Sequence, residues 1–206
     1  EWRPGHALRR FGSERRAAIG ELIVRRCYPA LMSESILLEA LRASPAAKRT
    51  LEYDFDFVPV AGAAKSALFQ GCGSAGYELI ATDASGGEFV LCDAEALPAR
   101  PMLYASSEGQ AGVIAHSLKS GLSTIIDLPY WQDCLKFSGG GQVAEMRRVI
   151  PLAEGDLLTD SPQIESSRHA LRAILGLLPL SDPIGELHAA LTNLSWLYPV
   201  RGSGLE

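Results

Sequence analysis

The chain has 206 residues, of which 47% are apolar and 21% charged, and its formal net charge is −5. This composition allows a sizeable core and argues against wholesale disorder, and no run of about 18 apolar residues is present that could cross a membrane. Nucleic-acid binding is disfavoured for the chain as a whole, because its basic residues concentrate at one end.

That end comprises residues 1–28, where seven arginines face three glutamates, a balance of 7 − 3 = +4. A first helix is predicted from Ser13 to about Arg26, with Pro29 ending it. A second helix is expected to begin after Ser33 and to close before Pro45. Neither helix carries a recognisable motif.

At Glu52 the period of the apolar residues changes from 3.6 to 2, because three aromatic residues alternate with two aspartates up to Phe57. This alternation predicts a half-buried strand with its aromatic side chains inward. Short connections to the following strands predict antiparallel pairing, since a parallel crossover needs about a dozen residues. The further strands are expected at Ala67–Gln70, Tyr77–Thr82, Glu88–Cys92 and Pro101–Ala105, with a hairpin turn at Asp83–Gly87.

A capped helix is predicted after the last of these strands. Ser107 and Gln110 have the spacing of a capping box, and Glu108 suits the positive end of a helix dipole. Apolar residues then recur at three- and four-residue steps, which predicts that the helix Gln110–Ile126 braces the sheet. Its apolar stripe would consist of Ala111, Ile114, Leu118, Leu122 and Ile125.

The chain after Asp127 has a helical pattern throughout. Pro129 suits the first turn of a helix that residues 138–141 would stop, and a further helix is expected to end at Pro151. The remaining boundaries are a linker at Pro151–Ser161 and two helices that open at Ser161-Pro162 and Asp182-Pro183.

These elements together predict one α+β domain over residues 1–201, built on a central antiparallel sheet of about five strands flanked by N-terminal helices. The sheet and its bracing helix would occupy residues 52–127, and a helical C-terminal region residues 128–201. The chain begins at Glu1 without a methionine or an apolar signal segment, so we expect a trimmed sequence, and residues 202–206 are typical of a cloning linker.

The four cysteines, at positions 27, 72, 92 and 134, lie far apart and form no C-x-x-C pair, and the histidines do not cluster with them. We therefore expect no metal site and interpret the cysteines as reduced thiols of a cytoplasmic protein. Residues 71–76 match G-x-G-x-x-G, but strand-forming residues follow where dinucleotide binding needs a helix, so no cofactor is expected.

A serine hydrolase is one alternative that the sequence leaves open. It would use Ser107 or Ser74 as the nucleophile. The candidate bases are His116, His169 and His188.

A family resemblance rests on three stretches in a fixed order: Gly86–Leu91, Pro101–Tyr104, and the Ser-Glu-Gly turn that leads into Gln110–Ile126. In this order and spacing, residues 52–127 resemble the SUKH superfamily. The resemblance implies an antiparallel sheet flanked by helices. It also implies a bacterial immunity protein that neutralises a toxin, or an interaction scaffold, and it brings no catalytic residues.

Residues 50–97 hold eight acidic residues against Lys65 alone, a balance of 1 − 8 = −7. Such a surface either keeps the protein soluble or meets a basic partner. With the resemblance it predicts a non-catalytic immunity protein that occludes the active face of a cognate toxin, with a scaffold or regulatory module as a further alternative. Tyr130 and Trp131 are either interface anchors or core residues. The residues expected to contact the partner are Asp54, Asp56, Glu78, Asp83, Glu88, Asp93, Glu95, Tyr130 and Trp131.

Overall fold

The computed structural model describes residues 33–69, 76–93 and 99–194. Contacts within the chain divide it into two units, Glu1–Ser33 and Glu34–Glu206, and all helices and strands given below belong to the second unit. Several predictions therefore lie outside the described residues: the Ser13–Arg26 helix, the glycine-rich loop at 71–75, Glu95, and the chain after Leu194.

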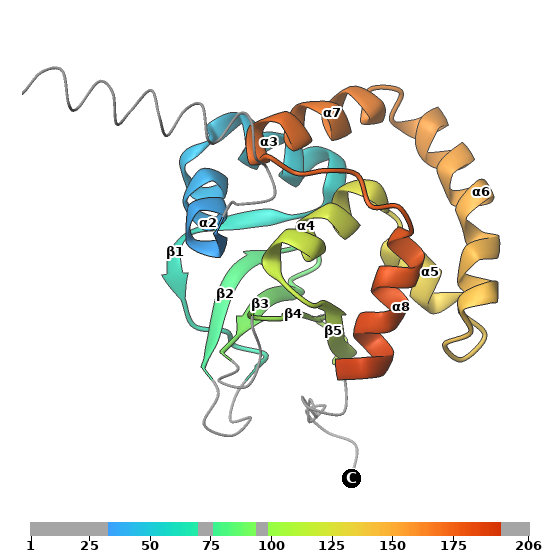
Figure 1. Cartoon of the computed structure of the whole chain (residues 1–206), viewed down its shortest axis with the longest axis horizontal. Helices are drawn as coiled ribbons and strands as arrows, with labels where there is room; N and C mark the ends of the chain where they lie inside the picture. Colours follow the sequence, from blue (N-terminus) through green and yellow to red (C-terminus); the bar gives the residue numbers. More distant parts are fainter. Residues whose placement is uncertain (1–32, 70–75, 94–98, 195–206) are drawn as a thin grey trace, which may run out of the picture. The chain divides into compact units, whose positions relative to one another are not determined.

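Five strands form a single antiparallel sheet in which every strand pairs with its neighbour in sequence (Figure 1). This arrangement confirms the predicted α+β fold with five antiparallel strands. The strands are β1 (Val58–Ala64), β2 (Tyr77–Thr82), β3 (Glu88–Cys92), β4 (Met102–Ala105) and β5 (Ala111–Ala115).

Seven helices are described in the same unit, two before the sheet and five after it. None of these described helices combines the length and the apolar character that a membrane span requires. The helices are α2 (Glu34–Ala43), α3 (Pro45–Phe55), α4 (Leu118–Asp127), α5 (Trp131–Lys136), α6 (Val143–Asp160), α7 (Ile164–Leu175) and α8 (Pro183–Leu194).

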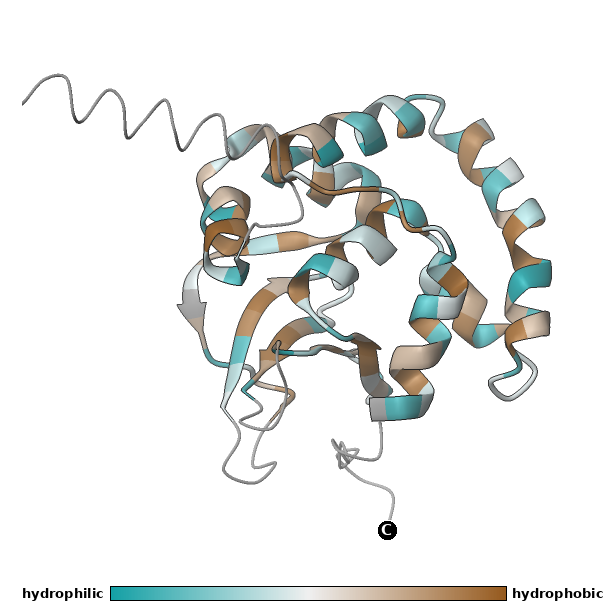
Figure 2. Ribbon diagram, in the orientation of Figure 1, coloured by the Kyte–Doolittle hydropathy of each residue, from teal (hydrophilic) through white to brown (hydrophobic). Residues whose placement is uncertain are grey.

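Both faces of the sheet are buried at β3 and β4, because every residue of these two strands is buried. On one face Val90, Leu103 and Val113 form a cluster with Ala190 of α8. On the other face α4 packs so closely that a Cβ added at Gly121 would lie 2.5 Å from the sulfur of Met102. Figure 2 shows the apolar residues concentrated along these strands and along the helix faces that meet them.

The strand predicted at Glu52–Phe57 is wrong, because residues 52–55 form the last turn of α3 and Asp56 is its C-cap. Ser44 caps that helix by accepting a hydrogen bond from the N–H of Ala47, and Pro45 suits its first turn. Leu51 and Phe55 are buried one helical turn apart, whereas Tyr53 points outward with 74% of its surface exposed. The same stretch therefore contains both an alternation of aromatic residues and the four-residue spacing of Leu51 and Phe55. The second pattern, together with the N-cap, matches the helix that forms.

The predicted helix start at Ser107 is also wrong. Ser106 and Gln110 close a hairpin turn between β4 and β5, with a backbone hydrogen bond of 2.7 Å and Gly109 at a φ of 86°. The helix begins only at Leu118, where Ser117 and Ser120 form a reciprocal capping box. The C-terminal part of the predicted apolar stripe is helical and buried, but Ala111 and Ile114 belong to β5.

The helix predicted to end at Pro151 continues through it, so the segment proposed as a linker is the second half of α6. Proline has no N–H group, so the carbonyl of Arg147, four residues earlier, lacks its helical hydrogen-bond donor. Arg147 and Pro151 are both exposed, so water can satisfy that carbonyl. The strand expected at Ala67–Gln70 is likewise not formed over residues 67–69, which make a bend.

Other helix boundaries agree with the sequence. Gly139–Gly141 have positive φ and follow α5, Gly176 ends α7 with a φ of 62°, and Pro183 begins α8. The hairpin turn at Asp83–Gly87 is also confirmed, with a 3.0 Å hydrogen bond between the N–H of Asp83 and the carbonyl of Gly87.

Candidate functional site

The acidic residues singled out by the sequence do not form one surface. Glu78 and Asp93 belong to an ion-pair network that also contains Glu34, Arg42 and Arg100, which we call the Arg100 cluster. Arg100 donates to Glu34 at 2.7 Å, to Glu78 at 2.8 Å and to Asp93 at 3.2 Å, and Arg42 donates to Glu78 at 2.7 Å. Arginines from outside the acidic window thus neutralise part of it.

The pKa of Glu78 reports the strength of this pairing. Burial of the side chain would by itself raise the pKa, but hydrogen bonds and charge from Arg42 and Arg100 outweigh burial and leave the pKa below its usual value. Glu78 is therefore held ionised by residues that also occupy both of its oxygens. A partner would have to displace an arginine to use it.

Asp83 is buried, with 5% of its surface exposed, and organises the β2–β3 turn. Its carboxylate accepts hydrogen bonds from the N–H groups of Ser85 at 2.9 Å and Gly87 at 2.7 Å, and from the Tyr104 hydroxyl at 2.6 Å. Burial opposes ionisation, yet these donors hold the pKa of Asp83 below its usual value.

Glu88 is buried as well, with 7% of its surface exposed. It accepts hydrogen bonds from the Ser66 hydroxyl and from the backbone N–H groups of Ala67 and Leu68, each of the latter at 3.1 Å. Both Glu88 and Asp83 therefore stabilise turns within the protein, and a partner cannot reach either carboxylate.

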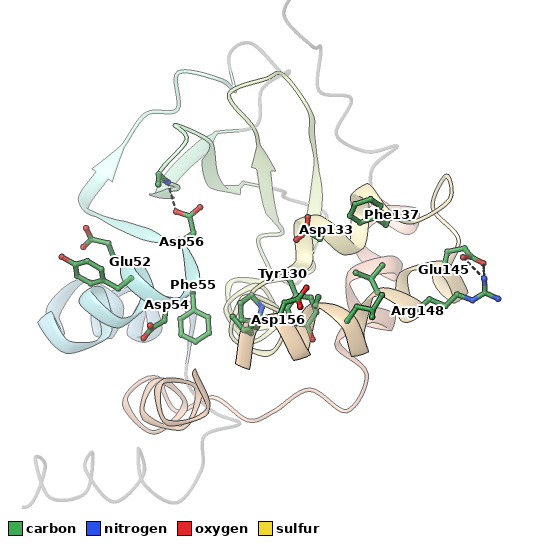
Figure 3. Close-up of a pocket in the computed structure, with 17 residues that line it drawn as sticks. Glu52, Asp54, Phe55, Asp56, Tyr130, Asp133, Phe137, Glu145, Arg148 and Asp156 are labelled. Atoms are coloured by element: carbon green, nitrogen blue, oxygen red, sulfur yellow. Dashed lines mark hydrogen bonds and ion pairs between the residues drawn. The ribbon is translucent and has the colours of Figure 1, made fainter. Parts of the chain in front are cut away.

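Asp54 and Asp56 lie elsewhere, on the rim of a large groove that we call the acidic groove. The end of α3, the β2–β3 turn at Ala84, α5 and one face of α6 enclose about 1020 Å³ (Figure 3). Six carboxylates and a single arginine line it: Glu52, Asp54, Asp56, Asp133, Glu145, Asp156 and Arg148.

The hydrogen bonds of Asp54 and Asp56 leave their charge in place. Asp54 accepts from the Gln163 amide at 3.0 Å and the Ser167 hydroxyl at 2.7 Å, and Asp56 accepts from the N–H of Ala84 at 2.8 Å. All three donors are neutral. The two carboxylates are fixed in position, and neither forms an ion pair among the described residues.

The only arginine lining the described groove is already paired. Arg148 lies 3.0 Å from Glu145, at the end of the groove away from α3 (Figure 3). Glu52, Asp133 and Asp156 are exposed and have no ion-pair partner among the described residues. The groove therefore keeps a net balance of 1 − 6 = −5.

Exposed apolar side chains line the same space. Tyr53 and Leu152 each expose 74% of their surface and Phe137 exposes 58%. Large apolar side chains rimmed by charges are typical of surfaces that bind a macromolecule. The groove thus offers both contact area and a negative field.

Of the two neighbouring aromatic residues, Tyr130 lines the groove and Trp131 lies in the core. Trp131 is 3% exposed and packs edge-on against Tyr104 with ring centroids 5.0 Å apart, so its role as an exposed anchor is wrong. Tyr130 lines the groove and donates from its hydroxyl to Glu154 at 2.7 Å. Burial and this hydrogen bond raise the pKa of Tyr130, which stays neutral.

A second ion-pair network fixes the α6 wall of the groove. Arg168 of α7 donates to Glu154 of α6 at 2.6 Å and to the backbone carbonyl of Ile126 at 3.1 Å. The hydrogen bond from Arg168 outweighs burial and holds the pKa of Glu154 below its usual value. The helices α4, α6 and α7 are therefore tied together behind the groove.

The residues considered for hydrolysis are not brought together in the described structure. Ser107 lies in the exposed β4–β5 turn, His169 is exposed on α7, and His188 bonds the carbonyl of Gly141 at 3.0 Å. No hydrogen bond joins Ser107 to an imidazole within these residues, and Ser74 lies outside them.

Cysteine chemistry has no evident support either. Cys92 and Cys134 are buried and form no disulfide among the described residues, and burial, with a smaller effect of the Asp133 charge, raises the pKa of the Cys134 thiol to about 11. Among the described residues, no three His, Cys, Asp or Glu side chains are grouped as a metal site requires.

Sequence reasoning missed the part of the groove that α5 and α6 supply, above all Asp133, Phe137, Leu152 and Asp156. The spacing of Val149, Leu152 and Ala153 carried the signal, since it continues a helical period across Pro151. Comparison with protein families, curated proteins and solved structures gave no match.

Proposed function

We propose that this protein is a non-catalytic immunity protein, which binds a cognate protein toxin through the acidic groove and occludes the toxin's active face. The observation that carries the proposal is the groove itself: five unpaired negative charges surround exposed apolar side chains in one concave site. Toxins that cleave or modify nucleic acids need basic active faces, and complementary charge accelerates association with such a face.

The division of the acidic residues supports this assignment. In the Arg100 cluster the carboxylates are paired with arginines, and Asp83 and Glu88 are buried, so these residues serve the fold. Among the described residues, the groove carboxylates make only the Glu145–Arg148 ion pair and the neutral hydrogen bonds of Asp54 and Asp56. A surface that keeps so much uncompensated charge beside apolar side chains suits a basic protein partner.

A growth assay tests the proposal. The product of the neighbouring gene would be expressed in a bacterial host with and without this protein, and a stable complex would be sought between the two purified proteins. We expect growth to be restored and a complex to form. Failure of the protein to protect the host or to bind the neighbouring product contradicts the proposal.

A charge-reversed variant shows whether the groove is responsible. Asp133→Lys combined with Asp156→Lys should abolish protection, since both carboxylates are exposed and line the groove. The matched control, Glu39→Lys with Asp160→Lys, reverses two exposed carboxylates outside the groove and should protect as well as the wild type.

A further inference from the structure

The long helix α6 has an apolar face that the described elements cover only in part. Met146 is the only fully buried residue among its 18 residues. Val149, Leu152, Ala153 and Leu157 follow one another at three- and four-residue steps and all line the groove. This spacing is that of a helix face which packs against another helix.

The volume of the groove is large enough for a short helix. Two turns of an α-helix occupy a cylinder about 10 Å across and about 11 Å long, or about 850 Å³. The groove encloses about 1020 Å³ between α6 on one side and the end of α3 on the other. Figure 3 shows Asp54 and Asp56 on the α3 side and Asp133 above α6, so an occupant would meet carboxylates on both sides.

The charge of the groove selects among possible occupants. In a symmetric dimer a second copy would bring the same acidic residues against themselves, and like charges in contact oppose association. A helix rich in lysine or arginine would instead meet Asp56, Asp133 and Asp156. Its apolar face would cover the exposed side chain of Leu152.

We infer that the acidic groove binds one basic amphipathic helix of about two turns, supplied by the protein partner. Apolar residues of this helix pack on the α6 face formed by Val149, Leu152 and Leu157, and its cationic side chains pair with Asp133 and Asp156. The inference rests on the proposed function for the identity of the partner, but the chemistry of the occupant follows from the groove.

A synthetic peptide provides the probe. We would label a Lys/Leu/Ala peptide of about 15 residues, with leucines at helical i, i+3, i+4 and i+7 spacing, and measure its binding to the full chain by fluorescence anisotropy. We expect saturable binding. A peptide of the same composition in scrambled order, and one with Glu in place of Lys, should bind at least about tenfold more weakly.

Matched variants on α6 localise the site. Leu152→Gln and Asp156→Asn should each weaken peptide binding, by about tenfold and about threefold respectively. Leu158→Gln and Asp160→Asn make the same changes on the same helix outside the groove and should leave binding unchanged. Leu152 and Asp156 are both exposed, so circular dichroism should show no loss of folding.

Three outcomes would overturn the inference. The first is binding of the scrambled peptide as tight as that of the amphipathic one. The second is a loss of binding in the Leu158 and Asp160 variants as large as in the groove variants. The third is a dimer in sedimentation that Leu152→Gln dissociates, which would make a second copy the occupant. A neutralisation assay with the cognate toxin distinguishes failure of this inference from failure of the proposed function. If the Leu152→Gln, Asp156→Asn double variant still neutralises the toxin, only the groove helix is refuted. If the wild-type protein does not neutralise it, only the immunity role is refuted.

Discussion

The Arg100 cluster and the acidic groove differ in how their carboxylates are paired: the cluster has three carboxylates with two arginines, and the groove is lined by six carboxylates and one arginine. In the cluster, Arg42 and Arg100 reach three carboxylates at 2.7–3.2 Å. In the groove, Arg148 is paired with Glu145, and the other five carboxylates form no ion pair among the described residues. The groove therefore presents more unpaired negative charge to a partner than the cluster does.

The difference shows how charge in a sequence window relates to a surface. Residues 50–97 have a balance of −7, yet the cations that neutralise Glu78 and Asp93 come from positions 42 and 100. Conversely, the groove gains Asp133 and Asp156 from helices far along the chain. Electrostatic complementarity therefore depends on which elements meet in space, and four variants test the contrast.

The largest effect is expected from Glu88→Ala. This change removes a buried carboxylate that accepts hydrogen bonds from the Ser66 hydroxyl and from the N–H groups of Ala67 and Leu68. Three partly buried hydrogen bonds are lost together, so we expect the free energy of unfolding to fall by about 3 kcal/mol. Urea denaturation measures the effect. Glu52→Ala, which removes an exposed groove carboxylate, serves as the control and should change stability little.

The next largest effect is expected from Arg100→Ala. Its removal leaves Glu34, Glu78 and Asp93 with Arg42 as their only counter-charge in the cluster. Because the pairs are partly buried, we expect a loss of about 2 kcal/mol in unfolding free energy. Arg148→Ala is the comparison in the groove and should cost less than about 0.5 kcal/mol, since that side chain is 77% exposed. Equal losses in the two variants would contradict the contrast between the regions.

Much of the fold could be predicted from local patterns. The strands at Tyr77–Thr82 and Glu88–Cys92 have the bounds that alternation and turn residues indicate, and Pro183 and Gly176 mark helix ends as expected. The local pattern was ambiguous where the two-residue period of a strand and the helical period of about 3.6 residues occurred in the same stretch. Phe55 belongs both to an alternating run and to a four-residue apolar spacing with Leu51, and only packing showed that the helix extends through it.

The β5 strand was missed for a related reason. Ala111 and Ile114 have the same three- and four-residue spacing as Leu118 and Leu122 of the helix α4. The apolar pattern of the helix therefore continues into residues that form a strand. The real cap, Ser117 with Ser120, lacks the Glu or Gln of the usual capping box and was overlooked.

The candidate site could be predicted only in part. Charge alone indicated Asp54 and Asp56, but the same criterion also selected Asp83 and Glu88, which are buried. The α6 wall was missed because Pro151 was interpreted as a helix end, and a proline with exposed neighbours does not always end a helix. Long-range contacts, which one sequence does not reveal, decide which acidic residues share a surface.

A smaller effect, confined to acid, is expected from Glu78→Gln. The pKa of Glu78 is below its usual value of 4.5 in the folded protein, so its ionised form stabilises the fold above that pH. As pH falls below about 5 this contribution is progressively lost. We therefore expect the variant to be less stable than the wild type by about 1 kcal/mol at pH 7, with the difference shrinking toward pH 3. Denaturation curves at both pH values measure it, and a constant difference would show that Glu78 does not act through its charge.

The smallest change in stability, but a clear change in binding, is expected from Asp133→Asn with Asp156→Asn. These exposed carboxylates contribute to no ion pair in the described structure, so unfolding free energy should stay within about 0.5 kcal/mol of the wild type. Association with a Lys-rich helical peptide should slow by about threefold for each lost charge at low salt, because the groove field steers the encounter. At about 1 M salt the Debye length falls to about 3 Å, and the variant and wild-type rates should converge. Stopped-flow fluorescence at both salt concentrations measures these rates, and a rate difference that persists in high salt would indicate lost contacts in place of a lost field.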